Sequence, residues 1–236
     1  MQGLSERVAL VPANRTVAEV VARLTDIETQ LNGFFAPGGP AVPPDGVACF
    51  NGMYLKVTEA VRDALPTFEN QAFIERLDIL FAQFYFDAYD AAAAQAWVSK
   101  AWEPLFARRA EHRLALQFAI AGMNAHINND LAHALVLTWD EFGFDAATRS
   151  DYDKINDILE AVETDIKAPL SDPFIAEVDT AFGTADDFLA LWSIRHARDQ
   201  AWERARIMQH VQGTELDGLF DRIVGFAGNL LLGPAV

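Results

Sequence analysis

Apolar residues recur at intervals of three and four along most of the chain, which is the spacing of one face of an α-helix. Between Thr16 and Gly33 they are Val17, Val20, Val21, Leu24, Ile27 and Leu31. Similar stripes predict helices over residues 47–65 and 70–94, the latter with a dense run of aromatic residues. Pro66 ends the first of these two, because proline lacks the backbone N–H that a helix needs.

The second half of the chain continues this pattern. A long apolar stretch predicts a helix over residues 113–141, which ends before Gly143. Further helix starts are indicated at Ser150 and at three sequences that resemble N-terminal caps, Asp172-Pro173, Thr184-x-x-Asp187 and Thr214-x-x-Asp217. No segment alternates as a half-buried strand does. We therefore expect an all-α, single-domain globular bundle of about eight helices around a buried central helix.

One internal segment interrupts the helical pattern. Residues 33–46 read GFFAPGGPAVPPDG, which is too rich in proline and glycine for a regular element. The segment is predicted to be a long loop or a mobile flap, and the most protease-sensitive internal part of the domain.

Composition places the chain among globular proteins. Of its 236 residues 51% are hydrophobic and 11% aromatic, enough for one large core. The formal net charge of −16 opposes binding to nucleic acid or to an anionic membrane surface. The single cysteine, Cys49, allows no intrachain disulfide, and no secretory signal pattern is present, so we expect a cytoplasmic protein. The weakly charged stretch 114–139 holds too many polar residues for a lone membrane span.

The candidate chemistry lies in the predicted central helix. Between Arg113 and Trp139 its ionisable side chains are His126, Asp130 and His133. In an α-helix, Asp130 lies about 40° from His126, and His133 about 20° to its other side, so all three share one face. Imidazole and carboxylate groups form acid–base pairs and bind divalent metals such as zinc or iron. The alternative is a buried hydrogen-bond network that locks the helix in place.

Further polar residues interrupt the apolar segments around this helix. Asn124 and Asn128 form a second pair, well over about 100° from the histidine face, and are added to the catalytic candidates. The preceding helices supply Tyr85 and Asp87, which face different directions, as catalytic candidates. They also supply the ligand-binding candidates Asn51, Tyr54 and Asp78. Each could instead be a satisfied polar group of the core.

A final cluster lies near the C-terminus, where Arg195, Arg198, Asp199 and Trp202 share one helical face. Two arginines beside aromatic residues can clamp an anion, so Arg195 and Trp202 join the ligand-binding candidates. The alternative is ion pairing with Asp199 inside the helix. The remaining histidines, His112, His196 and His210, are predicted to be solvated.

Four segments, CFNGMYLKVTEAV, FIERLDILFAQFYFDAYDAA, FAIAGMNAHINNDLAHAL and SIRHARDQAW, together resemble a family of bacterial proteins catalogued as a domain of unknown function. The resemblance implies a stand-alone helical domain whose motif contains Asn124, His126, Asn128 and Asp130. Residues 126–131 are also distantly similar to a stretch of the zinc-dependent phospholipase C and single-strand nuclease group. That second resemblance implies a zinc-dependent hydrolase.

Two main hypotheses follow. The first is an enzyme that acts on a small, largely apolar metabolite in an aromatic-lined pocket, with His126 and Asp130 as an acid–base or metal-binding pair. The second is a non-catalytic ligand-binding or structural protein in which the same polar groups form a buried network. Whether the cluster borders a cavity distinguishes them.

Overall fold

The computed structural model describes residues 15–33, 35–36, 38, 45–145, 147–171, 194–210 and 214–233. Their α-helices are α2 (Val17–Gln30), α3 (Gly46–Ala64), α4 (Gln71–Ala93), α5 (Glu103–Arg108), α6 (Ala115–Ala125), α7 (Leu131–Phe142), α8 (Thr148–Ser171), α11 (Ile194–His210) and α12 (Thr214–Leu232). A 3-10 turn covers Leu65–Thr67 and a π-helical turn covers His126–Asp130. No strand occurs among these residues, which confirms the predicted all-α class.

The first three helices begin where side-chain caps stand in the sequence. Thr16 and Glu19 form a reciprocal capping box at the start of α2. The Asp45 carboxylate accepts a hydrogen bond of 2.8 Å from the backbone N–H of Val47 at the start of α3, and Asn70 does the same at 3.1 Å for α4. These caps satisfy N–H groups that the helix itself cannot, so the predicted boundaries hold within one or two residues.

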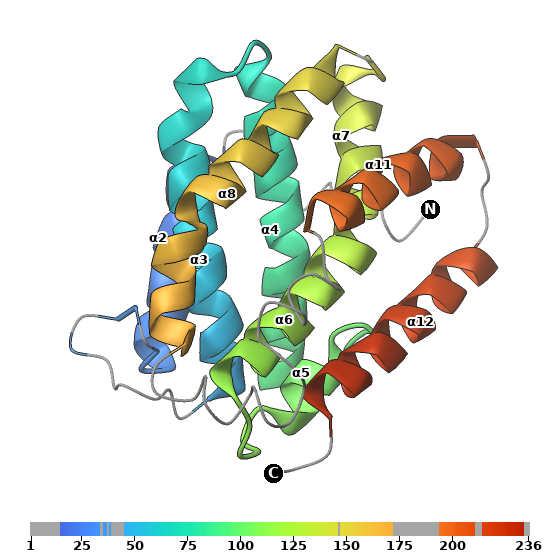
Figure 1. Cartoon of the computed structure of the whole chain (residues 1–236). Coiled ribbons are helices and arrows are strands. Elements are labelled where there is room, and N and C mark those ends of the chain that lie inside the picture. Colours follow the sequence, from blue (N-terminus) through green and yellow to red (C-terminus); the bar gives the residue numbers. More distant parts are fainter. Residues whose placement is uncertain are drawn as a thin grey trace.

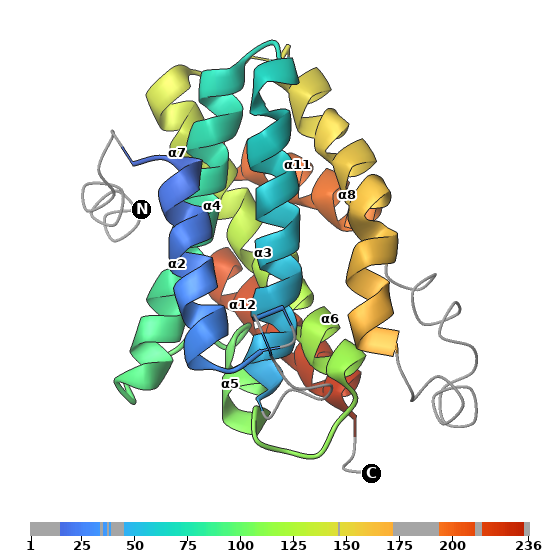
Figure 2. The ribbon, with the colours of Figure 1, turned by 90° about the vertical axis from the view of Figure 1, so that its left-hand side faces the viewer.

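The central helix of the prediction consists of α6, the π-helical turn and α7, which follow one another without a break. Figure 1 shows this helix rising obliquely to the right of α8, with α11 and α12 on its other side. Figure 2 shows α2, α3 and α4 side by side, with α8 next to α3. The central helix contacts α3, α4, α8, α11 and α12, so its apolar residues are surrounded by other helices.

Close packing of α3 against α6 depends on a glycine. A Cβ atom on Gly122 would lie 2.4 Å from the ring of Phe50, far closer than carbon atoms can approach. The missing side chain lets Phe50 enter the space beside the central helix. An aromatic wall is thus placed next to the polar residues that follow Gly122 in the sequence.

Several predictions lie wholly or partly outside the described residues. They are the cap signals at Asp172-Pro173 and at Thr184–Asp187, and most of the proline- and glycine-rich segment 33–46. Within the described parts of the chain, none of the helices is long and apolar enough to cross a membrane.

Candidate functional site

The π-helical turn at His126–Asp130 lies in the middle of the central helix. It replaces the i to i+4 bonding of an α-helix with i to i+5 bonding, so one extra residue is accommodated in the turn. Side chains after the turn are therefore displaced around the helix axis by about 100° compared with a continuous α-helix. The angles predicted above for an unbroken helix do not hold across it.

Asp130 is the hydrogen-bond acceptor at the centre of the cluster, and it is 2% exposed. Its Oδ2 atom accepts from the indole Nε1–H of Trp102 at 2.9 Å and lies 3.1 Å from Nδ1 of His126. Its Oδ1 atom accepts from the side-chain amide of Asn129 at 2.9 Å. A carboxylate accepts hydrogen bonds, so His126 carries its proton on Nδ1 and leaves the lone pair of Nε2 available.

Aromatic rings enclose the imidazole of His126. It stacks on Phe81 with 3.5 Å between ring centroids and 6° between ring planes, and it contacts the edge of Tyr54 at 4.7 Å. Burial lowers the pKa of His126, with the hydrogen bond and charge of Asp130 opposing that shift. The ring is thus neutral at physiological pH. Its Nε2 atom is buried and has no hydrogen-bond partner among the described residues.

A cavity of about 330 Å³ adjoins His126, between α3, α4, the central helix, α8 and α11. Apolar side chains form most of its wall. Its polar lining residues are Tyr54, Asp78, His126, Asn156, Glu160, Arg195 and Arg198. The volume lies near the lower end of the range of about 300–1,000 Å³ that is typical of small-molecule sites. The histidine of the predicted pair therefore borders a ligand-sized space.

Two acidic residues of this wall have a buried polar atom, the half-buried Asp78 and the buried Tyr54. The Oδ2 atom of Asp78 and the hydroxyl of Tyr54 are buried without a hydrogen bond of acceptable geometry from the described residues. Burial, with a smaller contribution from Glu75, raises the pKa of Asp78 to about 7. Burial also raises the pKa of Tyr54, and the charge of Asp78 adds to that shift. Both groups can hold a proton near neutral pH.

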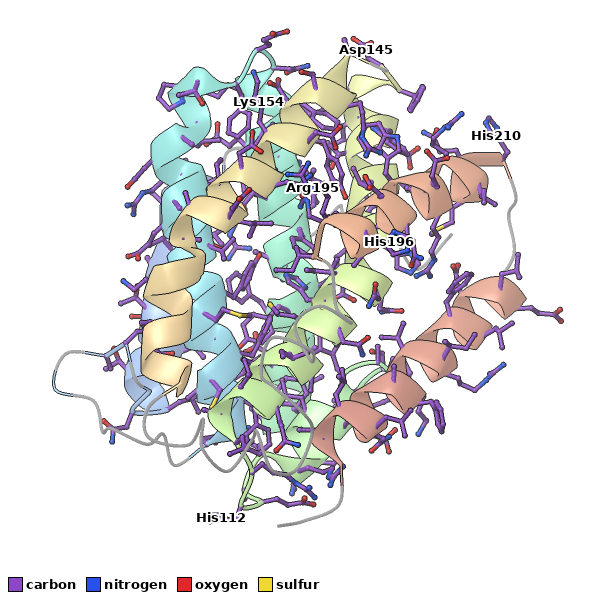
Figure 3. The ribbon with its side chains drawn as sticks, in the orientation of Figure 1. His112, Asp145, Lys154, Arg195, His196 and His210 are labelled. Atoms are coloured by element: carbon purple, nitrogen blue, oxygen red, sulfur yellow. The ribbon has the colours of Figure 1, made fainter. Side chains whose placement is uncertain are left out.

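Arginines line the cavity where α8 meets α11. The Arg198 side chain donates from Nε to Asn156 at 2.9 Å and from Nη2 to the carbonyl of Tyr152 at 2.7 Å. Arg195 is largely exposed and lies 3.6 Å from Asp157. Figure 3 places it at the first turn of α11, beside α8. The structure thus brings Arg195 and Arg198 to one cavity wall.

Asn124 and Asn128 lie away from the cavity, which corrects their prediction as catalytic residues. The Asn124 amide donates to the carbonyl of Val224 in α12 at 2.9 Å, and its oxygen accepts from Asn128 at 3.1 Å. Their expected separation from the histidine face is confirmed. The pair satisfies its amides against α12 and holds that helix in place.

Tyr85, Asp87 and Asn51 also lie outside the cavity wall. The Tyr85 hydroxyl donates to Asn51, whose amide donates to the carbonyl of Leu24 and to Glu28. Asp87 accepts from Gln83 within α4. Tyr85, not Asp87, therefore points inward, with its ring 6.3 Å from that of His126. These contacts are those of a core network, so no catalytic or ligand-binding role follows for the three residues.

The predicted grouping of His133 with His126 and Asp130 is wrong. The Nε2 atom of His133 lies 3.5 Å from Arg204, and its ring packs near Phe84, because the π-helical turn displaces it from the His126 face. The part of the chain that the structure describes contains no group of three or more His, Cys, Asp or Glu side chains that could hold a metal ion.

The remaining residues of the C-terminal cluster have structural partners. Trp202 packs 4.9 Å from both Trp139 and Tyr152 and does not line the cavity, so the structure does not bring it to this site. Asp199 pairs with Arg149 of α8 and not with the arginines of its own helix. His112, His196 and His210 are exposed, as predicted, and Figure 3 shows them at the periphery.

Sequence reasoning missed three residues of the site. Trp102 and Asn129 hold Asp130, and Phe81 stacks on His126. Trp102 lies 28 residues before Asp130 in a short segment without a motif, so no local signal connects the two. Asn129 was visible inside the polar run, but its direction depends on the π-helical turn.

The fold and the site define a helical-bundle protein with a buried aspartate–histidine pair beside a mainly apolar cavity. The chain belongs to the family of unknown function DUF5995, which matches residues 17–234. No curated protein and no solved structure shows significant similarity to it. The distant similarity to the zinc-dependent phospholipase C and nuclease group is therefore without support.

Proposed function

We propose that this protein is an enzyme that carries out acid–base chemistry on a small, largely apolar molecule bound in the cavity. In this reaction the Nε2 atom of His126 removes a proton, and Asp130 positions the ring. One observation carries the proposal. His126 borders the cavity, its Nδ1 is held by a carboxylate, and its Nε2 has no partner among the described residues.

The environment of His126 suits a general base. Burial lowers its pKa, so the ring is unprotonated and can accept a proton over a wide pH range. Asp130 holds the Nδ1–H and stabilises the positive charge that forms when Nε2 accepts a proton. Asp78 and Tyr54 line the same cavity and can return a proton to a second atom of the ligand. When His126 removes one proton and the cavity acid protonates a leaving group of the same molecule, the electron pair freed at the first atom forms a new bond and the bond to the leaving group breaks. This step needs no oxidant. It is a lyase-type elimination when the new bond is a double bond, and a cyclase-type reaction when the new bond closes a ring.

A non-catalytic ligand-binding protein is the second candidate, and the mainly apolar lining of the cavity favours it. In that case Nε2 of His126 would accept a hydrogen bond from the ligand and no proton would be transferred. The two functions require different properties of His126. Catalysis requires proton transfer, whereas binding requires one hydrogen bond.

Hydrogen exchange in heavy water separates these functions even when the product of the reaction is not identified. The purified protein is incubated in D₂O with pools of small metabolites, and deuterium uptake is followed by mass spectrometry. We expect at least one compound to gain deuterium, or to be converted, in a reaction that His126→Gln slows by about 100-fold or more.

His133→Gln provides the matched control, because it removes a histidine of the same helix that does not line the cavity. This variant should retain the rate of the wild type. If compounds bind without exchange or conversion in the wild type, the enzyme proposal is wrong and the ligand-binding function remains.

A further inference from the structure

Arg198 is a cavity residue that the proposed proton transfer does not use. It is 6% exposed, and its guanidinium lies 4.1 Å from the centre of the Tyr152 ring. Its hydrogen bonds go to two neutral acceptors, the side-chain oxygen of Asn156 and the carbonyl oxygen of Tyr152. Among the described residues no carboxylate lies within the 4.0 Å of an ion pair with it. Within the described part of the chain, this buried cation is thus held by two neutral acceptors and the ring of Tyr152.

Burying a guanidinium without an ion-pair partner is unfavourable in free energy unless an anion binds beside it. Burying an unpaired charge costs several kcal/mol, and buried charges in proteins are normally paired. Burial lowers the pKa of Arg198, and the charges of Asp153 and Asp199 compensate only in part. The guanidinium is always charged and presents a planar fork of donors that matches a carboxylate. The cavity is where its missing partner can bind.

The charges around the cavity favour an anion at this end. The described lining contains two permanent cations, Arg195 and Arg198, and they come from adjacent turns of α11. Arg195 pairs loosely with Asp157, and Glu160 is exposed at the same wall. That carboxylate opposes a highly charged headgroup. A single negative charge is therefore a better match than the double charge of a phosphate monoester.

We infer that Arg198, assisted by Arg195, binds the carboxylate of an amphipathic organic acid whose apolar part fills the remainder of the cavity. This inference rests on the proposed function and names its substrate class. The carboxylate lies between α8 and α11, and the apolar part contacts residues such as Met53, Val57 and Leu77 of α3 and α4. His126 borders the apolar part, so the proton is removed from the body of the molecule and not from its acid group.

Isothermal titration calorimetry with eight-carbon probes tests this inference directly. Octanoate, 1-octanol and octyl phosphate share one apolar chain and differ in their headgroup. We expect the wild type to bind octanoate at least 10-fold more tightly than either of the others. Arg198→Gln should weaken octanoate binding at least 10-fold and change the affinity for octanol less than 2-fold.

Arg206→Gln is the matched control, since Arg206 lies on the same helix, is 52% exposed and pairs with Glu203. It should bind all three probes as the wild type does. If Arg198→Gln does not fold, Arg198→Lys keeps the charge and removes the fork, and Arg195→Gln tests the outer arginine. Each should weaken octanoate binding 3-fold or more relative to octanol.

Four results overturn the inference. They are equal affinity for octanoate and octanol, no binding of either, tighter binding of octyl phosphate, and an equal loss for both ligands in the arginine variants. The titration does not depend on turnover. If octanoate binds but no compound of the metabolite pools exchanges hydrogen or is converted, the enzyme proposal alone is contradicted. If neutral compounds exchange hydrogen but octanoate does not bind, the carboxylate site alone is contradicted.

Discussion

The central helix carries two polar clusters on different faces, and they differ in how far the protein satisfies their hydrogen bonds. The Asn124 amide uses its nitrogen to bond Val224 and its oxygen to accept from Asn128. The His126 imidazole uses Nδ1 to bond Asp130, but its Nε2 has no partner within the described structure. Both clusters show i, i+4 spacing. The comparison shows how a structural role can be told from a functional one. A polar group in a core helix is structural when protein groups satisfy all its hydrogen bonds, and it is a candidate for function when one of its polar atoms has no protein partner.

The neighbours of each face explain this difference. On the asparagine face α12 approaches and supplies a backbone carbonyl, so each bond that forms also positions a helix. On the histidine face the neighbouring helices supply aromatic rings and a cavity, neither of which can bond Nε2. The first cluster should therefore affect stability when it is changed, and the second should affect function.

His126→Gln should produce the largest effect. It removes the proposed base, so the rate of any His126-dependent reaction should fall by about 100-fold to 10,000-fold. Its free energy of unfolding should change by only about 1 kcal/mol, since the glutamine amide can donate to Asp130 in place of the Nδ1–H, and Nε2 makes no hydrogen bond among the described residues. Parallel assays of deuterium exchange and urea unfolding check both values. A loss above about 3 kcal/mol in the free energy of unfolding would mean that His126 is a structural residue and not a functional one.

Asp130→Ala should have the largest effect on stability. The substitution leaves the N–H groups of Trp102, His126 and Asn129 without their acceptor in a dry environment. Loss of one partner of a buried charged network costs about 3–5 kcal/mol, which urea unfolding would detect. The sequence alone assigned His126 and Asp130 to one acid–base or metal-binding pair. The structure separates them, because Asp130 does not line the cavity.

Asn124→Ala should have an intermediate effect on stability. It removes the bond to the Val224 carbonyl and leaves the Asn128 amide without its acceptor, and we expect a loss of about 2 kcal/mol in the free energy of unfolding. Deuterium exchange and octanoate binding should remain those of the wild type. Reduced activity at full stability would show that the asparagine face also serves the site.

The sequence predicted most of the fold because the signals involved are local. The stripe from Val17 to Leu31 and the caps at Thr16 and Asn70 each act within one or two turns of a helix. The π-helical turn could not be predicted, since an α-helix suits the same residues and the turn packs against the distant helices α4, α11 and α12. His133 was placed wrongly for that reason.

The site was predictable only in part, for a related reason. His126 and Asp130 stand out because they interrupt an apolar segment. A cavity, however, is formed jointly by residues of five helices, and no single stretch of sequence predicts it. The hydrogen bond from Trp102 to Asp130 likewise joins two distant segments, and hydrophobic periodicity predicts each helix but not the contacts between helices. Contacts between distant segments decided which polar residues line the site and which support the core.

Asp78→Asn should have the smallest effect, and its dependence on pH is the informative quantity. The pKa of Asp78 is raised from 3.8 to about 7 by burial, so the folded protein holds this proton more tightly than the unfolded chain does. The contribution of Asp78 to stability is therefore lost as pH rises from about 4 to 7. Asparagine has no charge to desolvate. The difference of about 3 between these two pKa values corresponds to about 4 kcal/mol, but Asp78 is only half-buried and solvent screening reduces this effect. The variant should therefore gain about 1–2 kcal/mol over the wild type at pH 8 and nothing at pH 3.

Urea unfolding of both proteins between pH 3 and pH 8 measures this difference directly. Asp90→Asn is the control for a charge change on the same helix, since Asp90 pairs with Arg23 and is 61% exposed. It should show no comparable gain with rising pH. The Asp78 difference also reports on the cavity, because a bound carboxylic acid would place another negative charge in the same space and raise the pKa of Asp78 further. Saturating octanoate should thus extend the rise in the Asp78→Asn advantage above pH 7. An advantage independent of pH would mean that Asp78 is already ionised and solvated, and would remove it as the proton donor that complements His126.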